Sequence, residues 1–300
     1  MKVFDVVVLT DHRYLEERYE DPYSQNVINE DRAVVSALEA KGLKVCRTNW
    51  DNPDFDWKSA RYLLFRTTWD YFDRFNEFSV WLERVSQDCL LINPKELIYW
   101  NIDKHYLRDL ERAGIRIPPT IFLEPEEPRS LDAIAQGTGW NEFILKPAVS
   151  GAARHTYRFK RETISDYEAI FQSLVRHESM LLQEYQTQIT AKGEVAYMVF
   201  GGKFSHAVLK RAKPGDFRVQ DDFGGTIHHY SPSTEEIAFI EKAVQVCDPL
   251  PIYARVDVIR DNADRLSIGE IELIEPELWF RMHPPAAGKF ANAILSLIDQ

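Results

Sequence analysis

Three carboxylates and one guanidinium lie in two strand-like runs near the C-terminal end of the chain, Ile252–Ile259 and Leu266–Ile274. Side chains alternate across a strand, so Arg255 and Asp257 share one face. Glu270 and Glu272 likewise share a face of the partner strand. With a turn centred near residue 263, Asp257 lies opposite about residue 269, within diagonal reach of both glutamates. Carboxylate oxygens suit Mg²⁺, so the hairpin predicts a magnesium site, and a solvated acidic face is the alternative.

Two lysines far upstream could bind phosphate. Lys146 follows the apolar run Phe143–Leu145, which places a cation at the end of a predicted strand. The residues that follow, including Ser150 and Gly151, are small enough for backbone amides to approach an anion. Lys104 opens a predicted helix. Each lysine alone is typical of a surface charge, but together with the carboxylate hairpin they supply the parts that hold a triphosphate and its metal.

Length and composition limit the class of protein. The chain has 300 residues, enough for roughly two domains of about 150 residues. Its 36 basic and 47 acidic residues give a net charge of −11, which argues against nucleic acid or an anionic membrane as the main partner. Three widely spaced cysteines without a CxxC motif are typical of the reducing cytoplasm and exclude a cysteine-built zinc site. We therefore expect a cytoplasmic, enzyme-sized protein without a membrane span.

The first hundred residues alternate between strand and helix patterns. The strand-like runs are Val3–Leu9, a segment at Val45, Tyr62–Phe65 and Leu90–Ile92, and the helical ones are Asn29–Lys41 and Phe75–Val85. This order predicts an α/β N-terminal domain with an open, mostly parallel sheet.

Hairpin and cap signals dominate the rest of the chain. Gly201 and Gly202 join two strand-like runs at the spacing of a primed β-turn, and Ser233–Glu236 is a capping box. Further expected strands are Phe143–Leu145, His155–Phe159 and Met180–Tyr185, and further helices are Lys104–Ala113 and Thr163–Val175. The pattern predicts an α+β fold with antiparallel sheets.

The chain resembles the ATP-grasp ligases, especially their glutathione synthetase-like branch, from about Asn101 to Pro284. Eight motifs occur in the family order: Lys104; Leu145-Lys146-Pro147; Gln183-Glu184-Tyr185; Gly193-Glu194; Lys210; Arg218 with Gly224-Gly225; Arg255-Val256-Asp257; and Glu270-Ile271-Glu272. No single motif is specific, whereas their order and spacing are. The resemblance implies an N-terminal substrate domain over 1–100 and an ATP-grasp fold of two subdomains over 101–186 and 187–300.

The resemblance also implies how ATP is bound. Lys104 and Lys146 would contact its phosphates together with the loop at Ser150 and Gly151. Its base and ribose would be bound by Gln183, Glu184, Tyr185, Glu194 and Lys210, with Glu184 accepting from the exocyclic amine and Glu194 from the ribose hydroxyls. Without the resemblance, an ordinary strand end is the better interpretation of 183–185.

Metal and catalytic roles follow from the same resemblance. Asp257, Glu270 and Glu272 would bind one or two Mg²⁺ ions, and Arg255 and Arg218 would act in catalysis. Glu272 stands where the family usually has asparagine. Its extra negative charge could be offset by Lys210, by Arg211 or by a second Mg²⁺.

Three residues are candidates for substrate binding: Arg66, Thr68 and Arg281. The segment Phe65–Tyr71 follows a predicted strand, where open α/β sheets bind ligands. It is similar to a motif of the subgroup that includes the D-cycloserine-forming O-ureido-serine cyclo-ligase. Arg66 could hold a substrate carboxylate bidentately, or it could form a structural ion pair while Trp69 and Tyr71 pack.

The resemblance implies an ADP-forming ligase that joins a small-molecule carboxylate to an amine through an acylphosphate. The substrate would be an amino acid or a small peptide, and relatives suggest a homodimer or homotetramer. The alternatives are an intramolecular cyclo-ligase, a small-molecule kinase of the same fold, and a nucleotide-binding regulatory protein without catalysis.

Overall fold

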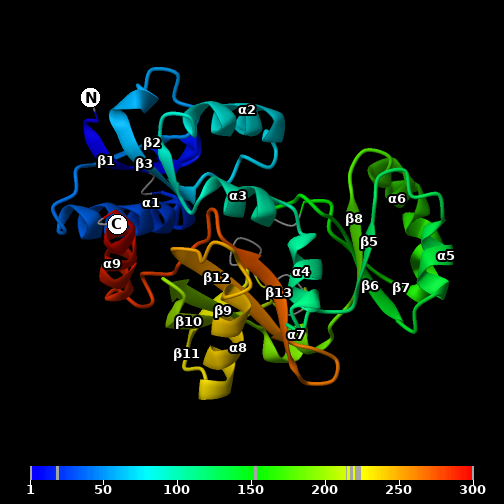
Figure 1. Ribbon diagram of the computed structural model, residues 1–300. Coiled ribbons are helices and arrows are strands. Elements are labelled where there is room, and N and C mark those ends of the chain that lie inside the picture. The colour runs from blue at the N-terminus through cyan, green and yellow to red at the C-terminus, as the bar shows by residue number, and fades with distance from the viewer. Residues whose placement is uncertain are drawn as a thin grey trace.

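Three β-sheets follow one another along the chain and form its framework (Figure 1). The structure is a computed structural model that describes residues 2–17, 20–151, 154–213, 215–216, 219 and 224–298. The first sheet is parallel and the other two are antiparallel, which confirms the predicted fold class. No helix in these described ranges is both long enough and apolar enough to cross a membrane.

The first sheet contains β1 (Phe4–Thr10), β2 (Val45–Asn49), β3 (Ala60–Thr67) and β4 (Leu90–Ile92) in the order β2-β1-β3-β4. Its alternate side chains pack on opposite faces. Val6 and Val8 pack with α1 (Pro22–Glu39) and α9 (Ala286–Ile298), whereas Val7 and Leu9 pack with α2 (Phe75–Val85). Burial on both faces explains why β1 is continuously apolar.

Helix α1 begins seven residues earlier than the predicted Asn29. Asp21 caps it by accepting a hydrogen bond from the Tyr23 amide, and Pro22 occupies the first turn, where its missing N–H costs nothing. The helix ends at Glu39, and Gly42 beyond it has a φ of +83°, a backbone conformation that suits glycine.

The second sheet is built from β5 (Thr120–Leu123), β6 (Glu142–Pro147), β7 (Tyr157–Lys160) and β8 (Met180–Glu184) in the order β5-β8-β6-β7. Helices α5 (Leu131–Gln136) and α6 (Glu168–Val175) pack against it (Figure 1). The predicted helix over Thr163–Val175 is divided, because its first part belongs to a 3₁₀ segment, η3 (Arg161–Tyr167).

The third sheet contains β9 (Glu194–Phe200), β10 (Lys203–Arg211), β11 (Thr226–Tyr230), β12 (Tyr253–Arg260) and β13 (Leu266–Glu272) in the order β11-β10-β9-β12-β13. Gly201 and Gly202, with φ of 55° and 75°, form the predicted tight turn. The capping box of Ser233 and Glu236 opens α8 (Thr234–Val244) as predicted. Helix α8 packs on one face of this sheet and α9 on the other.

A β-bulge between Asp257 and Val258 changes the predicted register of β12 and β13. Asp257 pairs with Glu270 rather than with residue 269, and Arg255 pairs with Glu272. The bulge therefore brings the charged residues of the two strands directly opposite each other.

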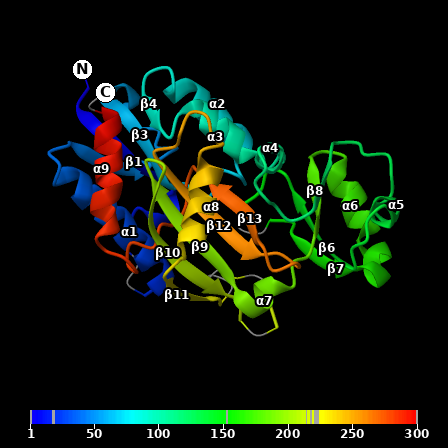
Figure 2. The same ribbon diagram turned by 60° about the horizontal axis from the view of Figure 1, so that its bottom comes forward.

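Short helices connect the sheets: η1 (His12–Tyr14), η2 (Trp57–Ser59), α3 (Lys95–Ile102), α4 (Tyr106–Arg112) and α7 (Gln188–Lys192). The C-terminal helix α9 returns to the first sheet and packs against α1 (Figure 2). Residues 187–300 thus supply both the third sheet and a cover for the first.

Candidate active site

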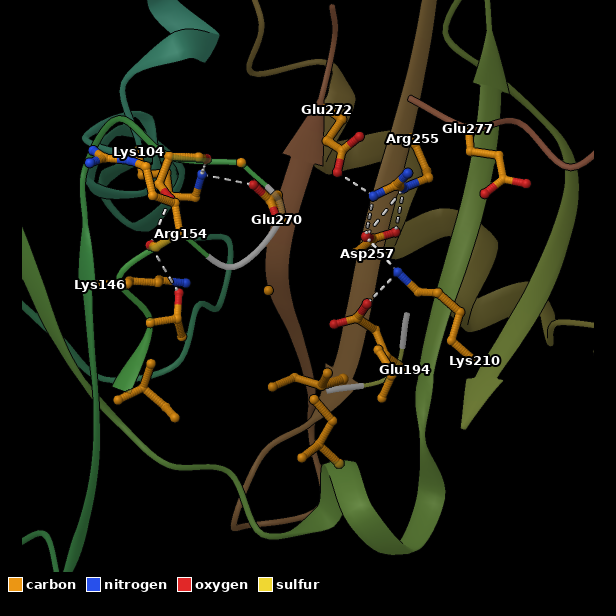
Figure 3. A pocket seen from close by; sticks show the side chains of 18 of the residues that line it. Lys104, Lys146, Arg154, Glu194, Lys210, Arg255, Asp257, Glu270, Glu272 and Glu277 are labelled. Carbon is orange, nitrogen blue, oxygen red and sulfur yellow. Dashed lines mark hydrogen bonds and ion pairs between the residues drawn. The ribbon is translucent and has the colours of Figure 1, made fainter. Parts of the chain in front are cut away.

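A cavity of about 580 Å³ brings together residues from all three parts of the chain. Thirteen of the predicted site residues line it: Lys104, Lys146, Ser150, Gly151, Gln183, Glu184, Tyr185, Glu194, Lys210, Arg255, Asp257, Glu270 and Glu272. Figure 3 shows Lys104 and Lys146 facing the charged residues of the third sheet. Residues more than 150 positions apart in sequence therefore converge on one space.

Cations occupy one wall of the cavity. Lys104 is buried, donates a hydrogen bond of 2.6 Å to the Ser150 carbonyl, and lies 3.0 Å from Glu270 Oε1. Lys146 extends from β6, and burial together with the charge of Lys104 lowers its pKa. A Cβ at Gly151 would lie 2.5 Å from the Phe72 ring, so any larger residue there would require the ring to shift. The loop after Lys146 thus contacts the N-terminal part of the chain.

Carboxylates and cations alternate on the opposite wall (Figure 3). Asp257 accepts from Lys210 Nζ at 2.8 Å and from Arg255 Nε at 3.0 Å. Arg255 also contacts Glu272, and Lys210 contacts Glu194. The arrangement is a continuous ladder of charge that runs across β10, β9, β12 and β13.

Burial and neighbouring charges shift the pKa values of this ladder in opposite directions. Burial opposes ionisation of Asp257, yet Arg255 and Lys210 hold its pKa below the usual value. Lys104 and Lys146 likewise outweigh burial and lower the pKa of Glu270. Burial raises the pKa of Glu272 to about 7, even though Arg255 opposes that shift.

The predicted magnesium ligands have the right chemistry and share one face of the hairpin. Carboxylate oxygens are suitable ligands for Mg²⁺, which usually takes only one or two carboxylates and completes its shell with phosphates and water. In the described part of the chain, no three acidic, histidine or cysteine side chains already surround one metal position. Asp257 and Glu270 instead bind lysine or arginine. Their role as metal ligands stays a prediction.

Arg255 is the cation that neutralises the extra charge of Glu272. The sequence suggested Lys210 or Arg211 for this role. Lys210 makes its direct contacts with Asp257 and Glu194, although its charge also lowers the pKa of Glu272, and Arg211 donates at 3.3 Å to the Ala191 carbonyl. The correction follows from the register, which places Arg255 directly opposite Glu272.

The predicted adenine-binding segment lines an apolar part of the cavity. Its neighbours there include Pro118, Ile144, Ile189 and Ile259. The Tyr185 amide donates to the backbone carbonyl of Glu142 at 3.0 Å, and the Tyr185 carbonyl accepts from Asn262 Nδ2 at 3.0 Å. Gln183 donates to Thr120, and Glu184 accepts from Gln186. The segment is thus held in place by its own hydrogen bonds, and its contacts with adenine stay a prediction.

Two predicted substrate residues do not reach the cavity. Arg66 is fully buried and lies 2.7 Å from Glu30 Oε1, so it forms the structural ion pair that was the alternative to carboxylate binding. Thr68 is also fully buried and does not line the cavity. The third candidate, Arg281, pairs with Glu277, whose side chain does line it. Arg218 lies outside the described residues.

Sequence reasoning missed a second group of lining residues: Arg13, Tyr14, Tyr23, Trp69, Phe72 and Asp73 from the N-terminal part, and Glu275, Glu277 and Trp279 after β13. Packing of Trp69 was one of two alternatives for the segment 65–71, and the structure shows that Trp69 lines the cavity and donates to the Glu275 carbonyl at 2.8 Å. Its place just beyond the carboxyl end of β3, the signal that made this segment a candidate, agrees with that position.

Glu275 lies beside these aromatic residues without a cationic partner among the described residues. Burial and the negative charge of Glu272 raise its pKa to about 8, although the Tyr71 hydroxyl donates a hydrogen bond to it. No lysine or arginine in the described ranges forms an ion pair with Glu275. The cavity therefore has a cationic end at Lys104 and Lys146 and an aromatic end at Trp69, where Glu275 has no cationic partner in the part of the chain that the structure describes.

Comparison with known proteins identifies the first part of the chain most specifically. Residues 6–93 match the family described as the N-terminal domain of D-cycloserine synthetase DcsG. The cycloserine biosynthesis protein DcsG of Streptomyces lavendulae is 28% identical over 278 residues, covering 84% of this chain and 91% of that protein.

Solved structures extend the similarity over nearly the whole chain. The crystal structure of D-cycloserine synthetase DcsG has a TM-score of 0.81 at 24% identity and covers 96% of this chain and 98% of that one. D-alanyl-alanine synthetase A from Vibrio cholerae has a TM-score of 0.67 at 14% identity, with coverages of 98% and 97%. The ATP-grasp ligase PsnB, bound to a precursor peptide and AMPPNP, has a TM-score of 0.61 at 15% identity, with coverages of 99% and 98%. These findings confirm the ATP-grasp fold and the predicted resemblance to ATP-grasp ligases, D-cycloserine synthetase DcsG among them.

Proposed function

We propose that this enzyme of the ATP-grasp class is an ADP-forming carboxylate–amine ligase that uses ATP and Mg²⁺ on an amino acid or a small peptide. One observation carries the proposal: the cations Lys104 and Lys146 face the carboxylates Asp257 and Glu270 across a single cavity. A triphosphate with its metal needs both kinds of group at once, because its charge must be neutralised while the reacting oxygens are held in line.

The first step would form an acylphosphate. A substrate carboxylate oxygen bonds to the γ-phosphorus of ATP, and the bond from that phosphorus to the β–γ bridging oxygen breaks, which releases ADP. Lys104 and Lys146 lower the repulsion between the two anions. A Mg²⁺ ion bound by Asp257, Glu270 and Glu272 would supply further positive charge on the phosphates.

The second step would join carbon to nitrogen. An amine attacks the acyl carbon, the carbon–oxygen bond to phosphate breaks, phosphate leaves, and the nitrogen loses a proton. Arg255 lines the cavity between two carboxylates and is fixed by bonds to both. Its guanidinium is therefore placed to stabilise charge on the transferring phosphoryl group and on the acyl oxygen.

The aromatic end of the cavity supports an amino acid as substrate. Glu275 has no cationic partner among the described side chains, and Trp69 and Trp279 line the cavity with it. A substrate ammonium group would neutralise this carboxylate and contact aromatic faces, both of which favour a cation. The substrate carboxylate would then point toward Arg255 and the lysines.

Product analysis tests the proposal. Purified protein is incubated with ATP, Mg²⁺ and a panel of amino acids and small peptides, and ADP, phosphate and product mass are measured. We expect equal amounts of ADP, phosphate and condensed product with at least one substrate pair. Lys146→Met should abolish this turnover, whereas Lys203→Met, which alters an exposed lysine paired with Glu241, should not.

Two results would contradict a ligase. A phosphorylated substrate that accumulates without release of phosphate would identify a kinase. Tight ATP binding without ADP formation across the panel would identify a non-catalytic nucleotide-binding protein.

An intramolecular cyclo-ligase is the second candidate function. The match of residues 6–93 to the DcsG N-terminal domain favours it, because the solved relative is named as a D-cycloserine synthetase. In such a reaction the attacking nitrogen and the carboxylate belong to one molecule. The same assay separates the two candidates, since a cyclic product forms from one substrate alone and is lighter than it by at least one water molecule.

A further inference from the structure

Trp279 has a backbone conformation that a bulky residue rarely adopts. Its φ is +46°, in the left-handed region. The side chain is only 3% exposed, and it lines the cavity in the irregular segment after β13. Such strain persists only where surrounding contacts hold it, and it clusters at functional sites.

A buried ion pair of the N-terminal domain holds the peptide groups on both sides of Trp279. Glu30 of α1 accepts hydrogen bonds from the amides of Leu278, at 2.7 Å, and Phe280, at 3.2 Å. Glu30 also lies 2.7 Å from Arg66 Nη2, and Arg66 is fully buried. One carboxylate thus fixes the backbone before and after the strained residue.

The indole ring of Trp279 faces the two cations that bind Asp257. Its centre lies 5.2 Å from Arg255 Cζ and 5.7 Å from Lys210 Nζ. Both distances suit the attraction of a cation to an aromatic face. Two positive charges that would otherwise repel each other therefore share one ring as well as one carboxylate.

We propose that Trp279 is a positioning residue whose indole face holds Arg255 and Lys210 toward the transferring phosphoryl group, and that the Glu30–Arg66 ion pair keeps the indole in place. The inference rests on the proposed function. Asp257 is an expected metal ligand, so a bound metal would compete with both cations for its oxygens. The indole face would remain as their common partner. Arg66 then acts on the site through Glu30 and Trp279 rather than by touching substrate.

A double-mutant cycle tests the contact without requiring activity. The unfolding of the full chain in urea is measured for Trp279→Leu, Arg255→Met and the double variant, with Trp279→Phe as the matched aromatic control. We expect the effects of Trp279→Leu and Arg255→Met on the unfolding constant to depart from additivity by at least threefold. The cycle with Trp279→Phe should be close to additive, because phenylalanine retains an aromatic face for Arg255. Additive effects of Trp279→Leu and Arg255→Met would overturn the contact.

Kinetics test the positioning role. Trp279→Leu should lower kcat at least tenfold while the Kd for ATP, measured by calorimetry, changes less than threefold. Trp279→Phe should keep kcat within about threefold of wild type, because it retains an aromatic face. Equal losses of kcat in the two variants would contradict positioning by the ring.

Glu30→Gln tests the second half of the inference. It should lower kcat in the same way, and adding Trp279→Leu should cause little further loss, because both changes act through one indole. If the losses of kcat from the two substitutions multiply in the double variant, the link from Glu30 to Trp279 is overturned. Should Trp279→Leu fail to fold, Glu30→Gln alone decides, because an unchanged kcat in that variant would overturn the link from Glu30 to Trp279.

Failure of this inference can be distinguished from failure of the proposed function. If wild-type protein forms no ADP with any substrate, the proposed function fails, and the unfolding cycle still decides whether the indole holds the cations. If turnover is normal but the cycle is additive, only the inference about Trp279 fails.

Discussion

Two buried arginine–carboxylate pairs in this molecule have different surroundings. Arg66 and Glu30 are 0% and 6% exposed, and the carboxylate is saturated by the guanidinium and two backbone amides. Arg255 and Asp257 are paired just as closely, but they line a cavity beside Lys210 and Glu272. Burial and pairing are thus common to a structural pair and a site pair. Access to a cavity, with further charges of both signs, distinguishes the second.

The largest expected effect is on the structural pair. Arg66→Met leaves Glu30 buried without its cation, so the free energy of unfolding should fall by about 3–5 kcal/mol. Urea unfolding measures the change, and the exposed Arg61→Met is the control, with an expected change within about 0.5 kcal/mol. Equal stability of the two variants would show that the buried pair is not structural.

Arg255 should respond in activity rather than in nucleotide affinity. Arg255→Met should lower kcat by about 10²–10³-fold, the usual loss for one donor that stabilises developing charge, while the Kd for ATP changes less than threefold. Arg260→Met alters an arginine farther along the same strand and should leave kcat unchanged. A loss of ATP affinity as large as the loss of kcat would assign Arg255 to nucleotide binding instead.

Glu275 tests whether the substrate amino group binds at the aromatic end of the cavity. Glu275→Gln should raise KM for an amino acid substrate about tenfold, because a charge-assisted contact to its ammonium group is lost. A substrate analogue that lacks the amino group should have the same KM with the wild type and with Glu275→Gln. Steady-state kinetics provide the test, with the exposed Glu235→Gln as control. An unchanged KM would place the ammonium group elsewhere.

The last expected effect is a dependence of stability on pH. The pKa of Glu275 is about 8 in the folded chain, well above its unfolded value, so the folded state holds a proton that the unfolded state has lost. Stability from this group is therefore complete below about pH 4 and decreases as the pH rises to about 8, by at most about 1.4 kcal/mol per pH unit. Glu275→Gln should flatten this decrease in urea unfolding without nucleotide or metal. An identical slope in both proteins would contradict the assignment.

The residues of the cationic and acidic walls could be predicted because each belongs to a short, ordered pattern. A lysine at a strand end and alternating acids in a hairpin have positions fixed by local geometry, and the structure places Lys146, Asp257 and Glu270 on one cavity. Their individual roles, the domain boundaries, the homo-oligomer and the cytoplasmic location stay predictions.

The rest depended on contacts that no local pattern contains. The bulge beside Asp257 shifts the register by one residue, and alternation alone cannot reveal such a shift. Arg66 follows the pattern of a ligand residue at a strand end, but its partner Glu30 lies 36 positions earlier on another element. Trp279 and Glu275 belong to an irregular segment, where only the folded chain decides which side chains face the cavity.

The return of α9 to the first sheet has a consequence for engineering this protein. Val6 and Val8 of β1 pack with α1 and with Phe290 and Ile294 of α9, so helix α9 completes this face of the first sheet. An exchange of substrate domains with a relative should therefore transplant the C-terminal helix along with the first hundred residues. A graft without it would leave that apolar face bare and prone to aggregate.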